Sequence, residues 1–539
     1  MSSSTLIEVF GHIAFSFTRG VTEHYNPQEP EYTAESFGYD PLQSTGREWY
    51  YAPVDELIYQ EYSDKDATSL DYLASNHPDI RVINACTPEE NEETEEDQQD
   101  EDRAMAWKRL RPSALRTVCK SMYIGAMISL LTATIIGSVC IFISYVCYKT
   151  INRCEFYPKE TIPVKVQWLR SISDAICVAF LYGSELLVFR FLFRSYQLNG
   201  VKRQLILVIC LAYGLDASYR MLLQALGVSH SKLSTVQKIP LFVFSTLSSC
   251  RQFYLLTKHF FERCSRRQQA LFFFQTLILV FSVVIIVIPE AEIIYPAYNK
   301  QDKDGKLLIA LFSPLIGVLL KVISRICVQR SWNITHPGYS HTLLAPLWCM
   351  SAVMFRVLQA DLDSLRSIVI LGIIHGATEV IERSTMVVID HICHVIWKRT
   401  SAPWGSFRTP RRERLMADVA IMSMLFESTA IVSVNGFLYL YHFIYLQNDS
   451  LLKLLQSFAI TTSVQLVIEW FFTSVSLAIE THYQNMAVMA VWRRRWKRHI
   501  LLATIVAAIV TSWTSTFLSL IAHGRFNESL SQPCKMPFS

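Results

Sequence analysis

The feature that most constrains this chain is a set of three long apolar segments that contain no charged side chain. Roughly 20 apolar residues in a helix are enough to cross the ~30 Å hydrocarbon core of a lipid bilayer. Each segment reaches that length, and soluble proteins very rarely hold three such runs. The sequence therefore predicts an integral membrane protein. The three segments are residues 121–148, 268–289 and 500–522.

Eight further segments are long enough to cross a bilayer but contain charged residues. Together with the first three, they predict an all-α, polytopic transmembrane helix bundle of about eleven spans. The alternating apolar and polar pattern of a transmembrane β-barrel does not occur. The eight segments are 169–193, 204–228, 239–259, 307–327, 342–359, 366–390, 415–445 and 454–480.

The weakest of these segments is 342–359, which is short and contains Arg356. Without it, every later span would reverse direction across the membrane. The basic stretches 408–414 and 493–498 would then lie outside, which the positive-inside rule disfavours. We therefore count 342–359 as a span.

The charges divide the chain into regions. Residues 1–102 hold 24 acidic and four basic residues, and the run 88–102 alone carries ten acids. Such a segment has little apolar surface to bury, which predicts disorder. We predict a mostly disordered cytoplasmic region at 1–105, a multi-pass domain at 106–523 and a short extracytoplasmic tail at 524–539.

The basic residues between spans predict the orientation. They concentrate in alternate connections, which places the N-terminus in the cytoplasm and the C-terminus on the extracytoplasmic side. Two glycosylation sequons, at Asn448 and Asn527, then lie outside, where glycosylation takes place. The sequence does not indicate which membrane holds the chain.

Several other classes of protein are disfavoured. The 13 cysteines form no CxxC pair and no zinc-like cluster, which argues against a zinc site or a disulfide scaffold. No cofactor is predicted. The basic clusters lie between spans, so we interpret them as anchors facing anionic lipid and expect no nucleic-acid partner. The expected partners are the lipid bilayer and a small ion or solute, and the oligomeric state is not predicted.

Charged residues inside spans are costly and usually face the interior of a bundle. In the first half of the chain, Asp216 and Arg220 stand four residues apart and can meet on one helix face. Arg251 can pair with Glu185. We interpret these four residues as intramembrane ion pairs, with an anion site at the two arginines as the alternative.

The second half carries more acid than base. His375, Glu379 and Glu382 share one side of the segment 366–390, and the next two spans add Glu427 and Glu469. Arg383 is the only basic residue expected nearby. Because like charges in a low dielectric cannot all stay ionised, some of these carboxyl groups must be protonated or a cation must lie among them. We predict cation or proton binding here. The plainer alternative is a set of protonated carboxyl groups that bond to neighbouring hydroxyls and amides.

Three functions remain open. Carboxylates at mid-membrane favour a transporter- or channel-like protein that handles protons or cations. The acidic N-terminal region suggests a receptor or scaffold instead. A metal-dependent intramembrane enzyme could use His375 and Glu379 with Glu427 or Glu469, although no HExxH or GxSxG motif is present.

Overall fold

The computed structural model covers the chain from residue 114 onward with short gaps. The described residues are 114–152, 154, 157–193, 198–228, 235–260, 266–330, 339–362, 364–398, 410–446, 451–484, 486, 488–526, 534 and 536. The acidic region 1–105 and both predicted glycosylation sites, Asn448 and Asn527, lie outside them.

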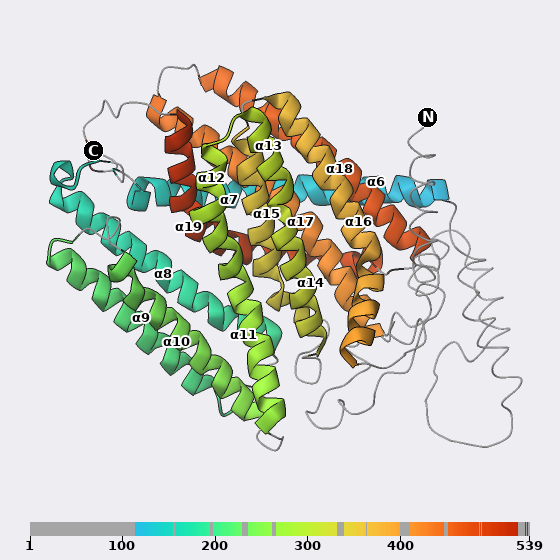
Figure 1. The fold of residues 1–539 in the computed structure, drawn as a ribbon, viewed down its shortest axis with the longest axis horizontal. Helices are drawn as coiled ribbons and strands as arrows, with labels where there is room; N and C mark the ends of the chain where they lie inside the picture. Colours follow the sequence, from blue (N-terminus) through green and yellow to red (C-terminus); the bar gives the residue numbers. More distant parts are fainter. Residues whose placement is uncertain are drawn as a thin grey trace, which may run out of the picture. The chain divides into compact units, whose positions relative to one another are not determined.

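The described residues are helical throughout, with no strand among them (Figure 1). Short π-helical or 3-10 turns, labelled η, extend or join the α-helices. The first helix runs without a break through α6 (Ala114–Leu131), η4 (Thr132–Ile136), α7 (Gly137–Cys147) and η5 (Tyr148–Asn152). The next elements are η6 (Lys159–Thr161), α8 (Val164–Leu192), α9 (Lys202–Ala225), α10 (Thr235–Phe260), α11 (Arg266–Pro289), η8 (Glu290–Ile294), α12 (Tyr295–Asn299), α13 (Lys303–Phe312) and α14 (Pro314–Arg330). The chain continues with η9 (Ser340–Leu343), α15 (Ala345–Ala360), α16 (Leu365–Lys398), α17 (Pro410–Leu446), α18 (Leu451–Ala478), η10 (Ile479–Tyr483) and α19 (Val488–Phe526).

Eight of these helices are long and apolar enough to cross a membrane. The predicted helical class is therefore confirmed, and these helices are consistent with an integral membrane protein. The other three predicted spans coincide with α10, α15 and α16, which are helical but do not belong to that group of eight. The total of eleven membrane spans stays a prediction.

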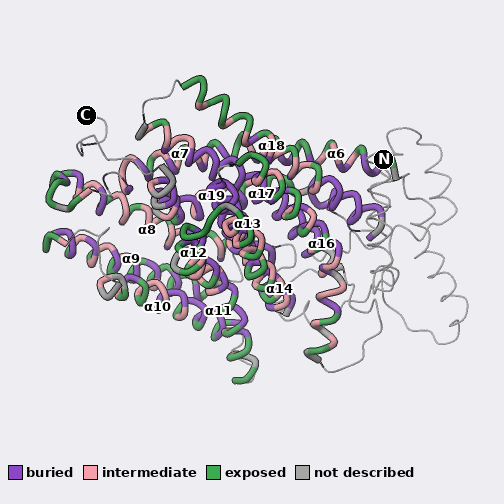
Figure 2. Tube along the Cα trace, turned by 45° about the horizontal axis from the view of Figure 1, so that its top comes forward, coloured by how far each residue is buried: buried purple, intermediate pink, exposed green. Residues whose placement is uncertain are grey.

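Large apolar side chains lie on the exposed surface of the helices as well as in the core, which is unusual for a water-soluble protein. In α17, every residue of the most apolar 18-residue stretch is buried (Figure 2). In α18, only 11% of the residues of the equivalent stretch are buried. Large apolar side chains are exposed on several helices, while charged side chains are buried. Extended exposed apolar surface is unfavourable in water, so it indicates an apolar surrounding. Examples of the exposed residues are Phe142, Phe180, Leu211, Leu319 and Leu452, and examples of the buried ones are Arg220, Arg356, Arg383, Glu427 and Glu469.

The chain folds as two compact units, each built from separate stretches of sequence. Among the described residues, the smaller unit contains 114–126 and those within 379–421 and 471–496, and the larger unit contains the others. In the smaller unit, Val118, Val380 and Val475 pack with the start of η10 to form an apolar core. In the larger unit, α8, α9 and α10 lie side by side, and α11 packs against α14 and α15 (Figure 1).

Proline lies at two boundaries between helical segments of the larger unit, which we call the proline interruptions. Pro289 is the last residue of α11, and the following turn, η8, is π-helical. Pro314 is the first residue of α14, directly after α13. Proline has no N–H to donate along the helix, so a regular α-helical bond is lost at each place.

A disulfide joins Cys154 to Cys534, with 5.7 Å between their Cα atoms. The 13 cysteines carry no CxxC spacing, so nothing in the sequence suggested this bond. The two residues are separated by 380 positions, so no local spacing could have identified them as partners.

Candidate functional site

The main charged cluster of the larger unit is built around Arg356 on α15. Its Nη2 donates to Oε2 of Glu427 on α17 at 2.8 Å and to Oε2 of Glu469 on α18 at 2.6 Å. The Nε atom also donates to Glu427, at 3.2 Å. All three side chains are at most 3% exposed. One guanidinium therefore bridges two buried carboxylates from different helices, and we call these three residues the arginine–carboxylate cluster.

Neighbouring groups hold the guanidinium in place. Its Nη1 donates to Gln359 Oε1 at 2.9 Å, one helical turn along α15. Gln359 Nε2 in turn donates to the carbonyl of Ile368 at 2.9 Å, which ties α15 to α16. A Cβ added at Gly372 would lie 3.1 Å from Gln359 Nε2. Glycine at this position therefore leaves room for the amide that orients Arg356.

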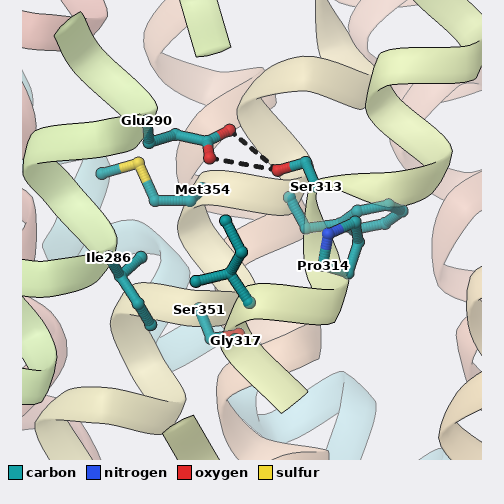
Figure 3. Close-up of a pocket in the computed structure, with 9 residues that line it drawn as sticks. Ile286, Glu290, Ser313, Pro314, Gly317, Ser351 and Met354 are labelled. Atoms are coloured by element: carbon teal, nitrogen blue, oxygen red, sulfur yellow. Dashed lines mark hydrogen bonds between the residues drawn. The ribbon is translucent and has the colours of Figure 1, made fainter. Parts of the chain in front are cut away.

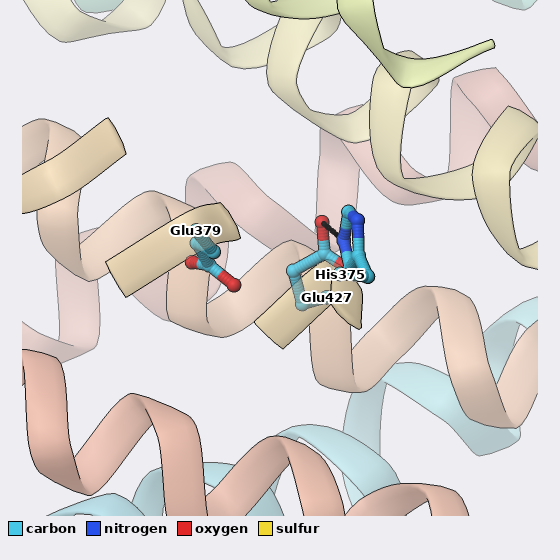
Figure 4. Close-up of side chains that lie close together, drawn as sticks. All are labelled: His375, Glu379 and Glu427. Atoms are coloured by element: carbon cyan, nitrogen blue, oxygen red, sulfur yellow. Dashed lines mark hydrogen bonds and ion pairs between the residues drawn. The ribbon is translucent and has the colours of Figure 1, made fainter. Parts of the chain in front are cut away.

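His375 on α16 contacts the cluster from the other side. Its Nε2 lies 3.5 Å from Glu427 Oε1 (Figure 4). The imidazole also stacks on the ring of Phe355, with 3.7 Å between ring centroids and 15° between planes. The stacking fixes the ring with one nitrogen toward the carboxylate. An imidazole can carry a proton, so this contact can alter the charge of the cluster.

In the hydrogen bonds described above, one guanidinium serves two buried carboxylates. Burial of like charges in a low dielectric is unfavourable unless they are compensated. Lys321 on α14 is another buried basic residue of this unit. Gln465, one turn before Glu469, buries its Nε2 without a hydrogen-bond partner among the described residues. A proton on His375 or a small cation next to Glu427 would change the charge balance of the cluster.

The smaller unit has a separate charged group. Arg383 on α16 makes a two-pronged contact with Glu480 in η10, with Nε to Oε1 at 2.8 Å and Nη2 to Oε2 at 2.7 Å. Glu379 lies one turn earlier on α16, with its Oε1 3.8 Å from Arg383 Nη1. Glu382 is half-buried. Two of the predicted carboxylates, Glu379 and Glu382, thus belong to this unit, while His375, Glu427 and Glu469 belong to the larger one.

In the first half of the chain, the structure brings Asp216 and Arg220 together across one turn of α9. Arg220 also pairs with Asp174 on α8. Glu185 accepts hydrogen bonds from Ser249 and Gln252 rather than from Arg251. Arg251 is exposed on α10, where its guanidinium lies 5.4 Å from the centre of the Tyr254 ring. Glu185 is thus hydrogen-bonded to neutral donors, in place of the ion pair with Arg251 that the sequence suggested.

Sequence reasoning missed three charged partners at these sites. Arg356 was considered only as a weakness of the segment 342–359, and neither Glu480 nor Asp174 was paired with an arginine. Glu427 and Glu469 lie 71 and 113 residues beyond Arg356, so the spacing carries no signal for these contacts. The surplus of unpaired acid in the second half was an indirect signal, because buried carboxylates require a partner.

No protein-family model, curated protein or solved structure matches this chain. The class of the protein therefore rests on its own features, namely helices able to cross a membrane and charged clusters buried between them.

Proposed function

We propose that the chain is a transporter- or channel-like membrane protein in which the arginine–carboxylate cluster and His375 handle protons or small cations. The observation that carries this proposal is the pair of carboxylates, Glu427 and Glu469, that share the single guanidinium of Arg356 beside a titratable imidazole. A proton or cation that binds here changes the strength of each contact in the cluster. Such a change can favour one arrangement of the helices over another. A transporter needs such a shift to couple ion binding to movement.

The same contacts disfavour a metal-dependent enzyme. The guanidinium of Arg356 already lies 2.8 Å from Glu427 and 2.6 Å from Glu469. A divalent metal bound by either carboxylate would lie close to this fixed positive charge, which is unfavourable. The receptor or scaffold alternative depends on residues 1–105, which lie outside the described residues.

We further propose eleven membrane crossings with the N-terminus in the cytoplasm, and the disulfide supports this number. Disulfides persist in oxidising compartments, so Cys154 and Cys534 belong on one extracytoplasmic side. An even number of crossings must therefore separate them. Of the eight most apolar helices, seven follow Cys154, which is an odd number. If α10, α15 and α16 also cross, ten crossings follow it and the two cysteines meet on the same side.

Charge movement on a solid-supported membrane tests the function without knowledge of the transported solute. Reconstituted wild-type protein should give a transient current after a jump in proton or Na⁺ concentration. His375→Gln and Glu427→Gln should lose most of the proton response, while Glu185→Gln should keep it, because that half-buried carboxylate lies outside the cluster. Equal responses from wild type and the two cluster variants, or a wild-type signal no larger than that of empty vesicles, would contradict the proposal.

A further inference from the structure

A small cavity lies in the larger unit next to the two proline interruptions (Figure 3). The centre of a water-sized molecule can move within a volume of about 20 Å³ inside it. A cavity needs roughly 10–15 Å³ on that measure to hold one water, so the occupant it fits is of the size of a water molecule or a bare ion. An organic solute is too large.

Three helical segments line the cavity, and each contributes two residues one turn apart. Ile286 and Glu290 come from the end of α11 and the π-helical turn η8, and Ser313 and Gly317 come from the junction of α13 and α14. Ser351 and Phe355 come from α15. Residues four apart share one helix face, so each segment directs one face at the cavity.

Glu290 is the only ionisable side chain among those that line the cavity. It is 5% exposed, and within the described part of the chain it accepts from the Ser313 hydroxyl, which lies 3.0 and 3.1 Å from its two carboxylate oxygens and is shared between them. The other buried carboxylates discussed above pair with arginine. A hydroxyl donor does not neutralise a carboxylate, so the charge of Glu290 is uncompensated.

The other polar side chains at the cavity carry hydroxyl oxygens. They belong to Ser313 and Ser351. A Cβ at Gly317 would lie 2.6 Å from the Ser351 hydroxyl oxygen, so only glycine leaves this hydroxyl its place. Carboxylate, hydroxyl and carbonyl oxygens are the ligands that hard cations prefer.

We propose that this cavity is a binding site for a small monovalent cation, with Na⁺ as the best fit, held by Glu290, Ser313 and Ser351. A single carboxylate matches one positive charge, whereas a divalent ion would leave the site positively charged. The site is distinct from the arginine–carboxylate cluster, but Phe355 joins them, because its side chain lines the cavity while its ring stacks on His375. Cation occupancy would therefore be felt at the imidazole next to Glu427.

The test is thermal unfolding of the purified full-length protein in detergent at pH 8, titrated with NaCl, KCl or choline chloride at constant ionic strength. Binding to the folded state raises the unfolding temperature by mass action. Na⁺ should raise it in a saturable manner and choline should not. Glu290→Gln should remove the Na⁺ response, and Ser351→Ala should weaken the apparent affinity about tenfold, which corresponds to roughly 1.4 kcal/mol.

Glu185→Gln is the matched control, since it removes another carboxylate that is held by neutral donors, and it should keep the Na⁺ response. If Glu290→Gln does not fold, Ser351→Ala carries the test, because it leaves the charge in place. Equal stabilisation by Na⁺ and choline would overturn the site, as would an unchanged Na⁺ affinity in Ser351→Ala. A response to pH alone would mean that Glu290 takes up a proton and that no cation site exists.

The outcome can be separated from that of the proposed function. Glu290→Gln should lose the current after a Na⁺ jump yet keep the current after a proton jump, which depends on His375. An unchanged Na⁺ current in Glu290→Gln, with the proton current still lost in His375→Gln, would remove the cation site and leave the proposal for the cluster standing.

Discussion

Arg356 and Glu469 lie 113 residues apart in sequence, yet Nη2 of the arginine donates to Oε2 of the carboxylate at 2.6 Å. The side chains are 3% and 2% exposed. At that depth neither charge is stable alone, because burial without a partner removes the hydration of an ion. The pair therefore depends on the simultaneous packing of α15 and α18 in the larger unit.

Arg356→Gln should be among the most destabilising single substitutions in the chain. It leaves Glu427 and Glu469 buried without a cation, and the loss of one partner from a buried pair costs about 3–5 kcal/mol. A large fall in the unfolding temperature of the purified protein, or a failure to accumulate in membranes, is the expected result. The triple variant that adds Glu427→Gln and Glu469→Gln should recover much of that loss, since no unpaired charge remains. If the triple variant is no more stable than Arg356→Gln, the pairing does not account for the effect.

The sequence was most informative where a pattern is local. Charge-free apolar runs predicted helices at α11 and α19, because length and composition alone decide whether such a helix can be placed in a bilayer. The four-residue spacing of Asp216 and Arg220 likewise placed both side chains on one face of α9. Both inferences need only the geometry of a single helix.

Contacts between different helices could not be predicted from the geometry of a single helix. Asp174 joins Arg220 only because α8 and α9 pack in one particular rotation and register. Arg251 faces outward, so Glu185 bonds instead to Gln252. The bridge from Arg356 to Glu427 and Glu469 similarly depends on how three helices pack. Helical periodicity gives the faces of a helix but not the neighbour that each face meets.

The cavity at Glu290 was missed for a different reason. Its residues come from the junctions of α11 with η8 and of α13 with α14, where proline changes the course of the helix. Glu290 directly follows the apolar run 268–289 and was not considered as a site residue. A proline directly before a carboxylate, at the end of such a run, is the one local signal that could have drawn attention to it.

The disulfide provides a test of the topology. Mass spectrometry of the non-reduced, protease-digested protein should detect a peptide pair that links Cys154 to Cys534. Cys154→Ser should lower stability by about 2–4 kcal/mol and abolish the linked pair, while Cys349→Ser, at a buried free thiol, should leave the pair intact. The linked pair must also lie on the side where Asn527 is glycosylated. Reaction of the reduced Cys534 thiol with impermeant reagents only from the cytoplasmic side would contradict eleven crossings.

The two carboxylates beside Arg383 should differ in importance. Glu480 contacts the guanidinium through two hydrogen bonds of 2.7 and 2.8 Å and is fully buried, whereas Glu379 approaches it at 3.8 Å. Hydrogen-bonded charge pairs with this geometry are much stronger than distant ones. Glu480→Gln should therefore lower the unfolding temperature clearly more than Glu379→Gln does. Equal effects would mean that the two-pronged contact is not the main attachment of η10 to α16.

His391 should make the protein sensitive to acid. This residue lies beyond the predicted span 366–390, and its pKa is lowered from the ordinary 6.5, first by burial and then by the positive charge of Arg412. The folded state thus favours neutral imidazole, while the unfolded chain binds a proton more readily. Since stability rises with pH wherever the unfolded state binds more protons, the contribution of this site is intact above about pH 6.5 and is lost as pH falls through the lowered pKa. His391→Gln should reduce the drop in unfolding temperature between pH 7.5 and pH 5, and His259→Gln, which removes an exposed histidine, should leave that drop unchanged. A drop of the same size in His391→Gln and wild type would show that other groups govern the acid response.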